Sequence, residues 1–243
     1  WRIDRAAIEA AISPKSRVIA VNTPHNPTGR ALSRAELQII ADIAIEHDLI
    51  VICDEVYEHL IFDGAPHIPV MGFPGMRERC VRIGSAGKTF SMTGWRIGYA
   101  TGPERLITGM MKAHQFVAYT CPPHLQIAVA EGLAMDDDYF TAFVAAMQAK
   151  RDLITKGLQS AGFDVLPCEG TYFATVDIRS VGRDDDVAFC REITEKAGVA
   201  AVPVSAFFPA DDREAPRHYA RFCFCKKREV IDEARRRLKI YFG

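Results

Sequence analysis

The stretch Leu49-Ile-Val-Ile-Cys53 decides the fold, because an unbroken apolar run of this length predicts a strand that is covered on both faces. Two similar runs, Arg17–Val21 and Cys80–Ile83, predict further strands, and Ile97–Ala100 predicts a fourth. Helical patterns lie between these runs. Buried strands that alternate with helices are typical of a largely parallel sheet with helices on its faces. The first half of the chain is therefore expected to have an α/β fold.

The clearest helix begins after Ser33. Ser33 and Glu36 have the spacing of a capping box, in which each side chain accepts a hydrogen bond from the other residue's backbone N–H. The residues expected on its buried face are Leu37, Ile40, Ala41, Ala44 and Ile45.

Cys121–Pro123 is the expected boundary between two domains, because the pattern changes beyond it. A long helix is expected at 137–161 and a shorter one at about 186–197. Short strand-like runs lie at 163–166, 172–178, 199–204 and 219–225, and the basic segment 226–239 predicts an amphipathic helix with a solvated face. We therefore predict the C-terminal part of a large domain at 1–120 and a small α+β domain at 121–243.

The composition excludes several classes of protein. A net charge of -1 gives no reason to expect nucleic acid or an anionic membrane as a partner. No apolar run approaches the length of a membrane-spanning helix, and the first residues do not form a signal peptide. The seven cysteines are scattered, which is typical of reduced thiols in a cytoplasmic protein. No metal site is expected, because the Cys223/Cys225 pair has no partner pair at zinc-ligand spacing.

Polar residues follow three of the predicted strands at the points where the strands end. The first strand leads into Asn22-Thr-Pro-His-Asn-Pro-Thr-Gly29, the second ends in Asp54, and the third ends in Ser85 with Lys88 close behind. Ligands of open parallel sheets bind beyond the carboxyl ends of the strands. These side chains are therefore expected to converge on one edge of the sheet and to form a site.

The residue types at these strand ends predict one particular chemistry. A lysine among buried groups can lose its proton and attack an aldehyde, and a buried aspartate needs a cationic or donor partner such as a pyridinium nitrogen. Ser85 and Arg96 flank Lys88 and offer a hydroxyl and a guanidinium, which suit a phosphate group. With the phenol of Tyr57, these groups together match pyridoxal phosphate.

The stretch Ser85-Ala-Gly-Lys-Thr-Phe-Ser-Met-Thr-Gly-Trp-Arg-Ile-Gly98 resembles the cofactor-lysine signature of the class I/II aminotransferases, which are fold-type-I pyridoxal-phosphate enzymes. Asn26-Pro-Thr-Gly29, Asp54-x-x-Tyr57 and Arg221-Phe-Cys223 resemble the other markers of this family, and they occur in the expected order. The resemblance extends over essentially the whole chain, and it implies a mostly parallel large-domain sheet followed by a smaller domain.

The resemblance implies a role for each residue of the cofactor site. Lys88 is expected to be the Schiff-base lysine and, once displaced by substrate, to move a proton between the substrate Cα and the cofactor C4′. Asp54 is expected to keep the pyridine nitrogen protonated. Asn26 and Tyr57 are expected to donate hydrogen bonds to the 3-oxygen of the ring. The phosphate ligands are expected to be Ser85 and Arg96.

The resemblance also implies the reaction. Arg221 is expected to bind the α-carboxylate of the substrate as a two-bond fork, and Asn26 is also expected to be a substrate-binding residue. The reaction would be a ping-pong transamination between an amino acid and a 2-oxo acid, carried out by a homodimer. The segments 22–29, 85–91, 169–173 and 221–224 are similar to those of the kynurenine, glutamine and methionine aminotransferase subgroup. That subgroup implies large apolar, aromatic or sulfur-containing amino acids as substrates.

Each of these residues also has an ordinary structural interpretation. Lys88 alone is compatible with a surface lysine, and Asp54 with a helix N-cap. Asn26 is compatible with a residue that stabilises the proline-rich turn. Tyr57 is compatible with a packed aromatic ring, and Arg221 with a charge on an edge strand. The spacing of the motifs favours the site over these alternatives.

Three functional hypotheses remain open from the sequence: an aminotransferase, a pyridoxal-phosphate carbon–sulfur β-lyase on the same fold, and a non-catalytic module that borrows the fold. The chain begins at Trp1 with no Met, whereas the family's large domain begins well before this point. We therefore expect an N-terminally truncated member of the family whose sheet has an uncovered edge.

Overall fold

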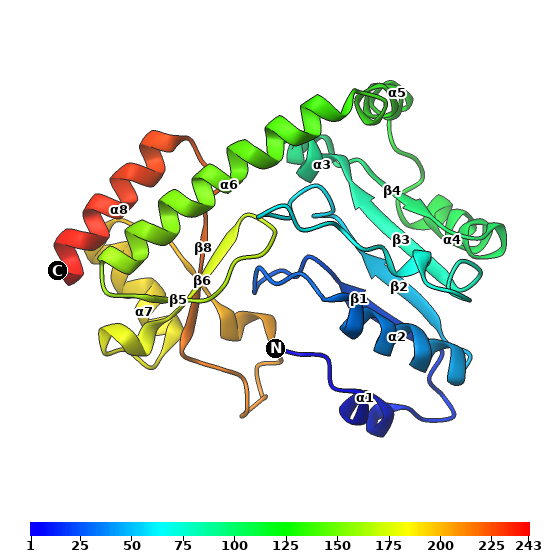
Figure 1. Cartoon of the computed structure of the whole chain (residues 1–243), viewed down its shortest axis with the longest axis horizontal. Helices are drawn as coiled ribbons and strands as arrows, with labels where there is room; N and C mark the ends of the chain where they lie inside the picture. The colour runs from blue at the N-terminus through cyan, green and yellow to red at the C-terminus, as the bar shows by residue number, and fades with distance from the viewer. The chain divides into compact units, whose positions relative to one another are not determined.

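The computed structural model describes residues 1–243 and contains two compact units (Figure 1). The first unit comprises residues 1–24 and 31–140, and the second comprises residues 25–30 and 141–243. A short loop from the N-terminal part of the chain therefore belongs to the second unit. The division into domains at residue 120 stays a prediction.

The first unit is built on a four-stranded sheet in the order β1-β2-β3-β4. Its strands are β1 (Val18–Asn22), β2 (Ile50–Asp54), β3 (Cys80–Ser85) and β4 (Gly98–Thr101). The first three are parallel, and β4 is antiparallel to β3. Asn22 lies opposite Asp54, and Asp54 lies opposite Ile83, so the carboxyl ends of the three parallel strands lie at one edge. This confirms the predicted α/β sheet.

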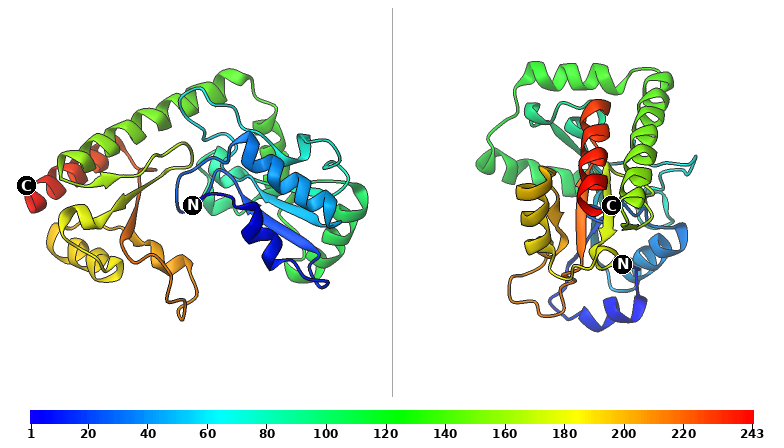
Figure 2. Two further views of the ribbon diagram at one scale, coloured as in Figure 1. Left: turned by 60° about the horizontal axis from the view of Figure 1, so that its bottom comes forward. Right: turned by 90° about the vertical axis from the view of Figure 1, so that its left-hand side faces the viewer.

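The first unit also contains helices. They are α1 (Arg5–Ala11), α2 (Arg34–Glu46), α3 (Ala86–Thr89), α4 (Glu104–Val117) and α5 (Pro123–Leu133), and α6 (Asp137–Ser160) begins here and continues into the second unit. Short 3-10 turns lie at Val70–Gly72 and Thr93–Trp95. α1 and α2 lie side by side on one face of the sheet (Figure 2), and both contribute apolar side chains to a core cluster with β2.

The predicted capping box at the start of α2 is confirmed. The Ser33 hydroxyl accepts from the Glu36 backbone N–H, and the Glu36 carboxylate accepts from the Ser33 backbone N–H at 3.0 Å. The predicted buried face of α2 is wrong at one position, since Ile45 is 43% exposed and Ile43 is wholly buried. α2 is covered by α1 as well as by the sheet, so its buried face differs from the face that a single covering surface would select.

The second unit has a four-stranded antiparallel sheet in the order β5-β6-β8-β7. Its strands are β5 (Asp164–Val165), β6 (Phe173–Asp177), β7 (Val202–Pro203) and β8 (Tyr219–Cys223), and its further helices are α7 (Asp186–Glu192) and α8 (Arg228–Phe242). Short 3-10 turns lie at Ile178–Val181 and Val204–Phe207, and a π-helical turn at Ile193–Ala197 follows α7. The α+β pattern expected for this part of the chain is therefore present, although β7 is shorter than its sequence pattern predicts.

α6 and α8 lie side by side in the second unit (Figure 2). Gly157 of α6 makes this approach possible, because a Cβ atom there would lie 2.2 Å from Cγ of Arg235 on α8. α8 is also tied to α7, since the Tyr241 hydroxyl donates to the Glu192 carboxylate at 2.6 Å.

Glu192 makes the stability of the second unit depend on pH. Its carboxylate also accepts from Arg183 at 2.8 and 2.9 Å, and the hydrogen bonds of Arg183 and then Tyr241 lower its pKa to about 2. A carboxyl group whose pKa is lower in the folded state than in the unfolded state stabilises the fold at pH values above its ordinary pKa. This contribution is lost as the pH falls toward 2. Glu192→Gln is expected to reduce the free energy of unfolding by about 1 kcal/mol at pH 7, since partial exposure of Arg183 screens the pair.

Urea unfolding at pH 7 and pH 3 measures this effect. The difference between wild type and Glu192→Gln is expected to be smaller at pH 3 than at pH 7. Glu195→Gln, an exposed position three residues away, is the control and should change little at either pH. An equal loss of stability at both pH values would contradict the assigned role of the Glu192 charge.

The outer strand β4 has three exposed residues among its four, and the predicted uncovered edge stays a prediction. None of the helices combines the length and the apolar character that crossing a membrane requires.

Candidate active site

The carboxyl end of β2 places the first group of candidate residues. Asp54 ends the strand, and its Oδ1 accepts from the backbone N–H of Val56 at 3.3 Å. Asn22, at the end of β1, donates from its side-chain amide to the Asp54 carbonyl at 2.9 Å. The turn after β2 then buries Tyr57, of which 3% is exposed. The predicted convergence of Asn22 and Asp54 at one sheet edge is therefore observed.

Lys88 lies beside Tyr57. β3 ends at Ser85, and the short helix α3 carries Lys88 in its last turn with a half-buried side chain. Its Nζ lies 5.9 Å from the centroid of the Tyr57 ring. An amine over an aromatic face is attracted when it carries a proton. The structure thus brings a lysine, a phenol and a strand-end carboxylate to neighbouring elements of the first unit.

Gly87 and Thr93 hold the segment around Lys88 in place. The Thr93 hydroxyl donates to the Gly87 carbonyl at 3.1 Å. A Cβ at Gly87 would lie 3.1 Å from Cα of Thr93, so a larger residue would push the following 3-10 turn away. This close approach explains why a glycine precedes the lysine.

Ser85 and Arg96 lie at the two ends of this same segment. Ser85 is opposite Gly98 in the β3–β4 ladder, so Arg96, two residues before Gly98, lies near the end of β3. Ser85 caps α3 without a side-chain hydrogen bond to it, so the cap does not occupy its hydroxyl. Arg96 is exposed, has a φ of 58° and donates to the Thr93 carbonyl at 3.3 Å. Both side chains can serve as donors to an anion.

Asn26 and Arg221 form the second group, within the second unit. The loop 25–30 packs on β6, where the Thr175 hydroxyl donates to the Pro27 carbonyl at 3.0 Å. Thr175 lies opposite Arg221 in the β6–β8 ladder. The loop therefore brings Asn26 to Arg221, whose Nη1 donates to Oδ1 of Asn26.

Gly29 allows the loop to pack so closely. Its carbonyl accepts from the backbone N–H groups of Glu169 and Gly170 at 2.9 and 2.8 Å. Its φ is +74°, and a Cβ there would lie 3.0 Å from the Phe173 carbonyl oxygen. Both the backbone conformation and the lack of space therefore require glycine.

Two aromatic rings orient the Arg221 side chain. Its Cζ lies 4.0 Å from the centroid of the Phe173 ring and 4.8 Å from that of the Phe207 ring. Aromatic faces attract a guanidinium and hold its plane, so the two-pronged donor group is fixed before any ligand binds. Phe207 belongs to the turn after β7 and is in no motif, so only the folded chain identifies it.

The structure thus assigns the predicted residues to two groups. Asp54, Tyr57, Ser85, Lys88 and Arg96 belong to the first unit, and Asn26 and Arg221 belong to the second. Phe207 was not among the predicted site residues, and the bond between Asn26 and Arg221 was not predicted. The first group contains an amine, a carboxylate, a phenol, a hydroxyl and a guanidinium. These donor and acceptor types fit the aldehyde, ring nitrogen, ring oxygen and phosphate of pyridoxal phosphate.

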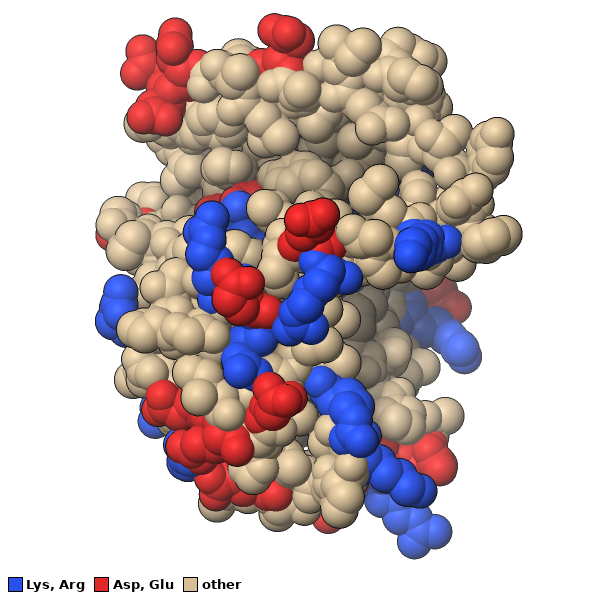
Figure 3. Space-filling view, turned by 90° about the vertical axis from the view of Figure 1, so that its right-hand side faces the viewer, with Lys and Arg blue, Asp and Glu red and all other residues tan.

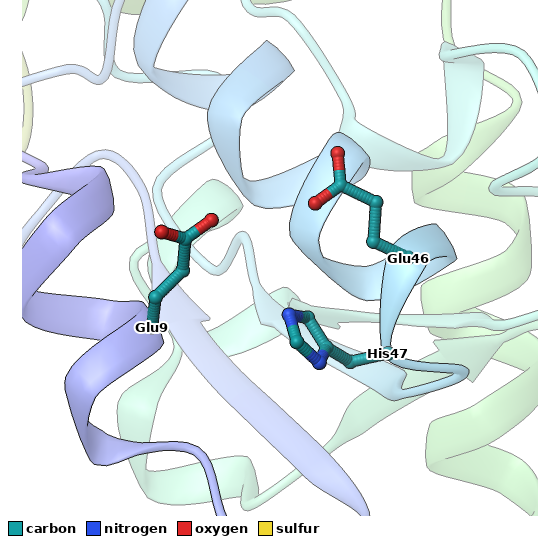
Figure 4. Close-up of side chains that lie close together, drawn as sticks. All are labelled: Glu9, Glu46 and His47. Atoms are coloured by element: carbon teal, nitrogen blue, oxygen red, sulfur yellow. The ribbon is translucent and has the colours of Figure 1, made fainter.

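One cluster of side chains offers ligand atoms for a metal ion (Figure 4). Glu9 of α1 and Glu46 and His47 at the end of α2 have ligand atoms within 4.8 Å of one another, and all three residues are exposed. Arg5 pairs with both carboxylates, at 2.8 Å to Glu9. A guanidinium already pairs with both carboxylates, which makes the cluster an ordinary surface ion-pair network.

The chain is similar to several characterised or named enzymes. It is 45% identical to the probable N-succinyldiaminopimelate aminotransferase DapC of Mycobacterium tuberculosis, over 99% of this chain and 62% of that protein. It is 39% identical to kynurenine–oxoglutarate transaminase 3 of Mus musculus, over 96% of this chain and 55% of that protein. The methionine aminotransferase of Escherichia coli is 36% identical, over 98% of this chain and 61% of that protein. The chain thus spans about three fifths of the length of these relatives.

Comparison with solved structures also finds similarity to aminotransferases. The N-succinyldiaminopimelate aminotransferase from Mycobacterium tuberculosis superimposes with a TM-score of 0.94 at 46% identity, covering 98% of this chain and 62% of that one. The Escherichia coli protein YbdL, described as having a methionine aminotransferase function, gives a TM-score of 0.92 at 36% identity, over 98% of this chain and 62% of that one. The family model for aminotransferase class I and II matches residues 1–238. This protein therefore belongs to the class I and II aminotransferases.

Proposed function

We propose that this protein is a pyridoxal-phosphate-dependent aminotransferase that transfers an amino group between an amino acid and a 2-oxo acid, with Lys88 as the lysine that attaches the cofactor. The placement of Lys88 Nζ 5.9 Å from the Tyr57 ring, beside the strand end that carries Asp54, is the observation that carries the proposal. Members of the class I and II family depend on this cofactor, which supports it further.

Bound pyridoxal phosphate supplies an aldehyde carbon for the amino group and a ring that stabilises negative charge at the substrate Cα. Lys88 has two tasks. Its amine would hold the cofactor covalently before substrate arrives, and afterwards it would take the proton from the substrate Cα and return it at the cofactor C4′.

The other cofactor residues set the charge around Lys88. Asp54 would accept from the protonated ring nitrogen. Tyr57 and Asn26 would donate hydrogen bonds to the ring oxygen. Ser85 and Arg96 would bind the phosphate, for which a hydroxyl at a helix start and a guanidinium are suitable donors.

Arg221 binds the α-carboxylate of both substrates, and Asn26 supports it through their mutual hydrogen bond. The amino acid and the 2-oxo acid share this carboxylate, so the same side chains bind each of them in turn. That is the requirement of a ping-pong reaction.

Large apolar, aromatic or sulfur-containing amino acids are the proposed substrates, and similarity to the kynurenine and methionine enzymes supports this class. The 45% identity to the probable N-succinyldiaminopimelate aminotransferase favours a second candidate, a succinylated diamino acid. The two candidates differ in the side chain of the substrate and share the α-carboxylate that Arg221 would bind.

The proposal is tested with the purified chain and added pyridoxal phosphate. A visible absorbance band is expected, and reduction with borohydride followed by peptide mapping should place the cofactor on Lys88. Methionine, kynurenine, glutamine and N-succinyldiaminopimelate are then supplied with 2-oxoglutarate. One equivalent of 2-oxo acid for each amino acid consumed is expected. Pyruvate and ammonia from cystathionine would instead indicate a β-lyase, and no cofactor on Lys88 would contradict the proposal.

A homodimer is also proposed, because α4 and the residues after it expose large apolar side chains. Phe116, Val117 and Tyr119 are 87%, 85% and 80% exposed. The face on which α4 lies has broad areas without charged side chains (Figure 3). Exposed apolar surface of this kind marks interaction sites. Sedimentation equilibrium would measure the oligomeric state.

A cytoplasmic location stays a prediction that rests on the scattered free cysteines.

A further inference from the structure

A buried ionic network lies behind the strand ends that carry the candidate active site. It begins at Glu55, the residue after Asp54. The β ladder continues through both residues, since the Glu55 backbone N–H donates to the Ile83 carbonyl at 2.9 Å and the Asp54 carbonyl accepts from Thr23. Side chains alternate between the faces of a strand, so the Glu55 side chain leaves the sheet on the face opposite that of Asp54.

The Glu55 carboxylate is wholly buried and paired with two basic residues. Its Oε2 accepts from His67 Nε2 at 2.7 Å and from Arg82 Nε on β3 at 2.7 Å. Its Oε1 is buried and receives no hydrogen bond. Burial acts to raise the pKa of Glu55, but His67 and Arg82 outweigh it, so this pKa lies below its ordinary value. A buried charge of this kind is tolerated only because its partners are fixed.

Arg82 extends the network to the turn that carries Tyr57. Its Nη2 forms an ion pair with Glu58, which has a nearly buried side chain. The other oxygen of Glu58 accepts from the Tyr99 hydroxyl of β4 at 2.7 Å. Gly84 makes this bond possible, because a Cβ there would lie 2.1 Å from the Tyr99 ring.

Three further features complete the surroundings of the network. His59 Nε2 lies 3.9 Å from Glu58, and burial followed by the charge of His67 lowers the His59 pKa. Burial raises the pKa of Tyr99 against the opposing effect of Arg82. The pKa of the Cys53 thiol is raised, first by a hydrogen bond with the Cys80 thiol and then by burial. The charge of Glu55 adds to the effect. Two carboxylates therefore share one guanidinium, with His67 as the second donor to Glu55.

We propose that Glu55, Glu58 and Arg82 are positioning residues for the aminotransferase site, which fix Asp54, Tyr57 and Lys88 relative to one another by joining the ends of β2, β3 and β4. This inference rests on the proposed function. Asp54 is the neighbour of Glu55, and Tyr57 is the neighbour of Glu58. β3 leads from Arg82 through Ser85 to Lys88. A shift in any member of the network is therefore transmitted along the backbone to a residue that would touch the cofactor.

The test uses Glu55→Gln, which keeps the shape of the side chain and removes its charge. With pyridoxal phosphate attached to Lys88, the pH midpoint of the visible band is measured. It is expected to fall by roughly half to one unit, because loss of a buried negative charge disfavours a nearby cation. The kcat is expected to fall about tenfold with KM for the amino acid unchanged, because the substrate-binding Arg221 is not part of the network.

Two further variants sharpen the experiment. Tyr99→Phe removes only the hydroxyl that bonds to Glu58 and is expected to lower kcat by at least about threefold, again with KM unchanged. If the Glu55→Gln protein does not fold, the Tyr99→Phe result alone tests the positioning role. Glu131→Gln, an exposed position on α5, is the matched control and should leave the midpoint and kcat as in wild type.

The outcomes separate this inference from the proposed function. If wild type shows no band that depends on Lys88, both are overturned. A second outcome is that the wild-type protein shows the band while the Glu55→Gln and Tyr99→Phe proteins have the same midpoint and the same kcat as wild type. In that case only the positioning role is overturned. A loss of thermal stability alone, with an unchanged midpoint and kcat, has the same meaning, since that is what a purely structural ion pair would give.

Discussion

Lys88→Ala is expected to abolish covalent attachment of pyridoxal phosphate and to lower transamination by roughly a thousandfold or more. Alanine removes the amine that is proposed both to hold the cofactor and to move the substrate proton. The half-buried α3 segment should keep its shape, because its bonds are made by the backbone and by Thr93. The measurement is the visible spectrum before and after borohydride, followed by single-turnover kinetics with an amino acid.

The matched control is Lys112→Ala, which removes an exposed lysine of α4 in the same unit. It is expected to keep the wild-type spectrum and rate. If cofactor remained attached to the Lys88→Ala protein after reduction, another lysine would be the attachment site, and the assignment of Lys88 would be wrong.

The second large effect is expected at Arg221. Arg221→Lys keeps the positive charge and removes the planar two-pronged donor group that contacts the rings of Phe173 and Phe207. A lysine ammonium cannot make the paired hydrogen bonds to a carboxylate. The value of kcat/KM for the amino acid is expected to fall by about 30-fold to 150-fold, the equivalent of one charge-assisted interaction of about 2–3 kcal/mol.

The cofactor spectrum separates this effect from that of Lys88. Arg221→Lys should still show the band attached to Lys88, and the loss should appear in KM and in the inhibition constants of simple carboxylates. Arg217→Lys, an exposed position on the segment before β8, is the control. A wild-type kcat/KM in the Arg221→Lys protein would show that another residue binds the α-carboxylate.

Local rules account for what the sequence analysis predicted well. The Ser33–Glu36 capping box involves residues three positions apart, and the strand ends at Asp54 and Ser85 follow from apolar runs with a polar terminus. α5 was not predicted, because Pro122-Pro123 was interpreted only as a domain boundary. A proline is compatible with the first turn of a helix, and here α5 begins at Pro123.

Long-range contacts explain what the sequence could not show. Asn26 and Arg221 are 195 positions apart, and their bond depends on the pairing of β6 with β8. Glu55 is adjacent to Asp54 in the sequence, yet its partners His67 and Arg82 come from a loop and from another strand. No local pattern distinguishes a solvated glutamate after a strand from one that is buried in an ion network.

The loop 25–30 has a practical consequence for dissecting this enzyme into fragments. A gene cut at residue 140 would separate residues 141–243 from the short peptide that supplies the Gly29 and Pro27 carbonyls. The hydroxyl of Thr175 and the amides of Glu169 and Gly170 would then lose their acceptors, and Arg221 would lose Asn26. The second unit is thus not a transplantable module, and its recombination with another family member would have to exchange two separate segments of the gene together.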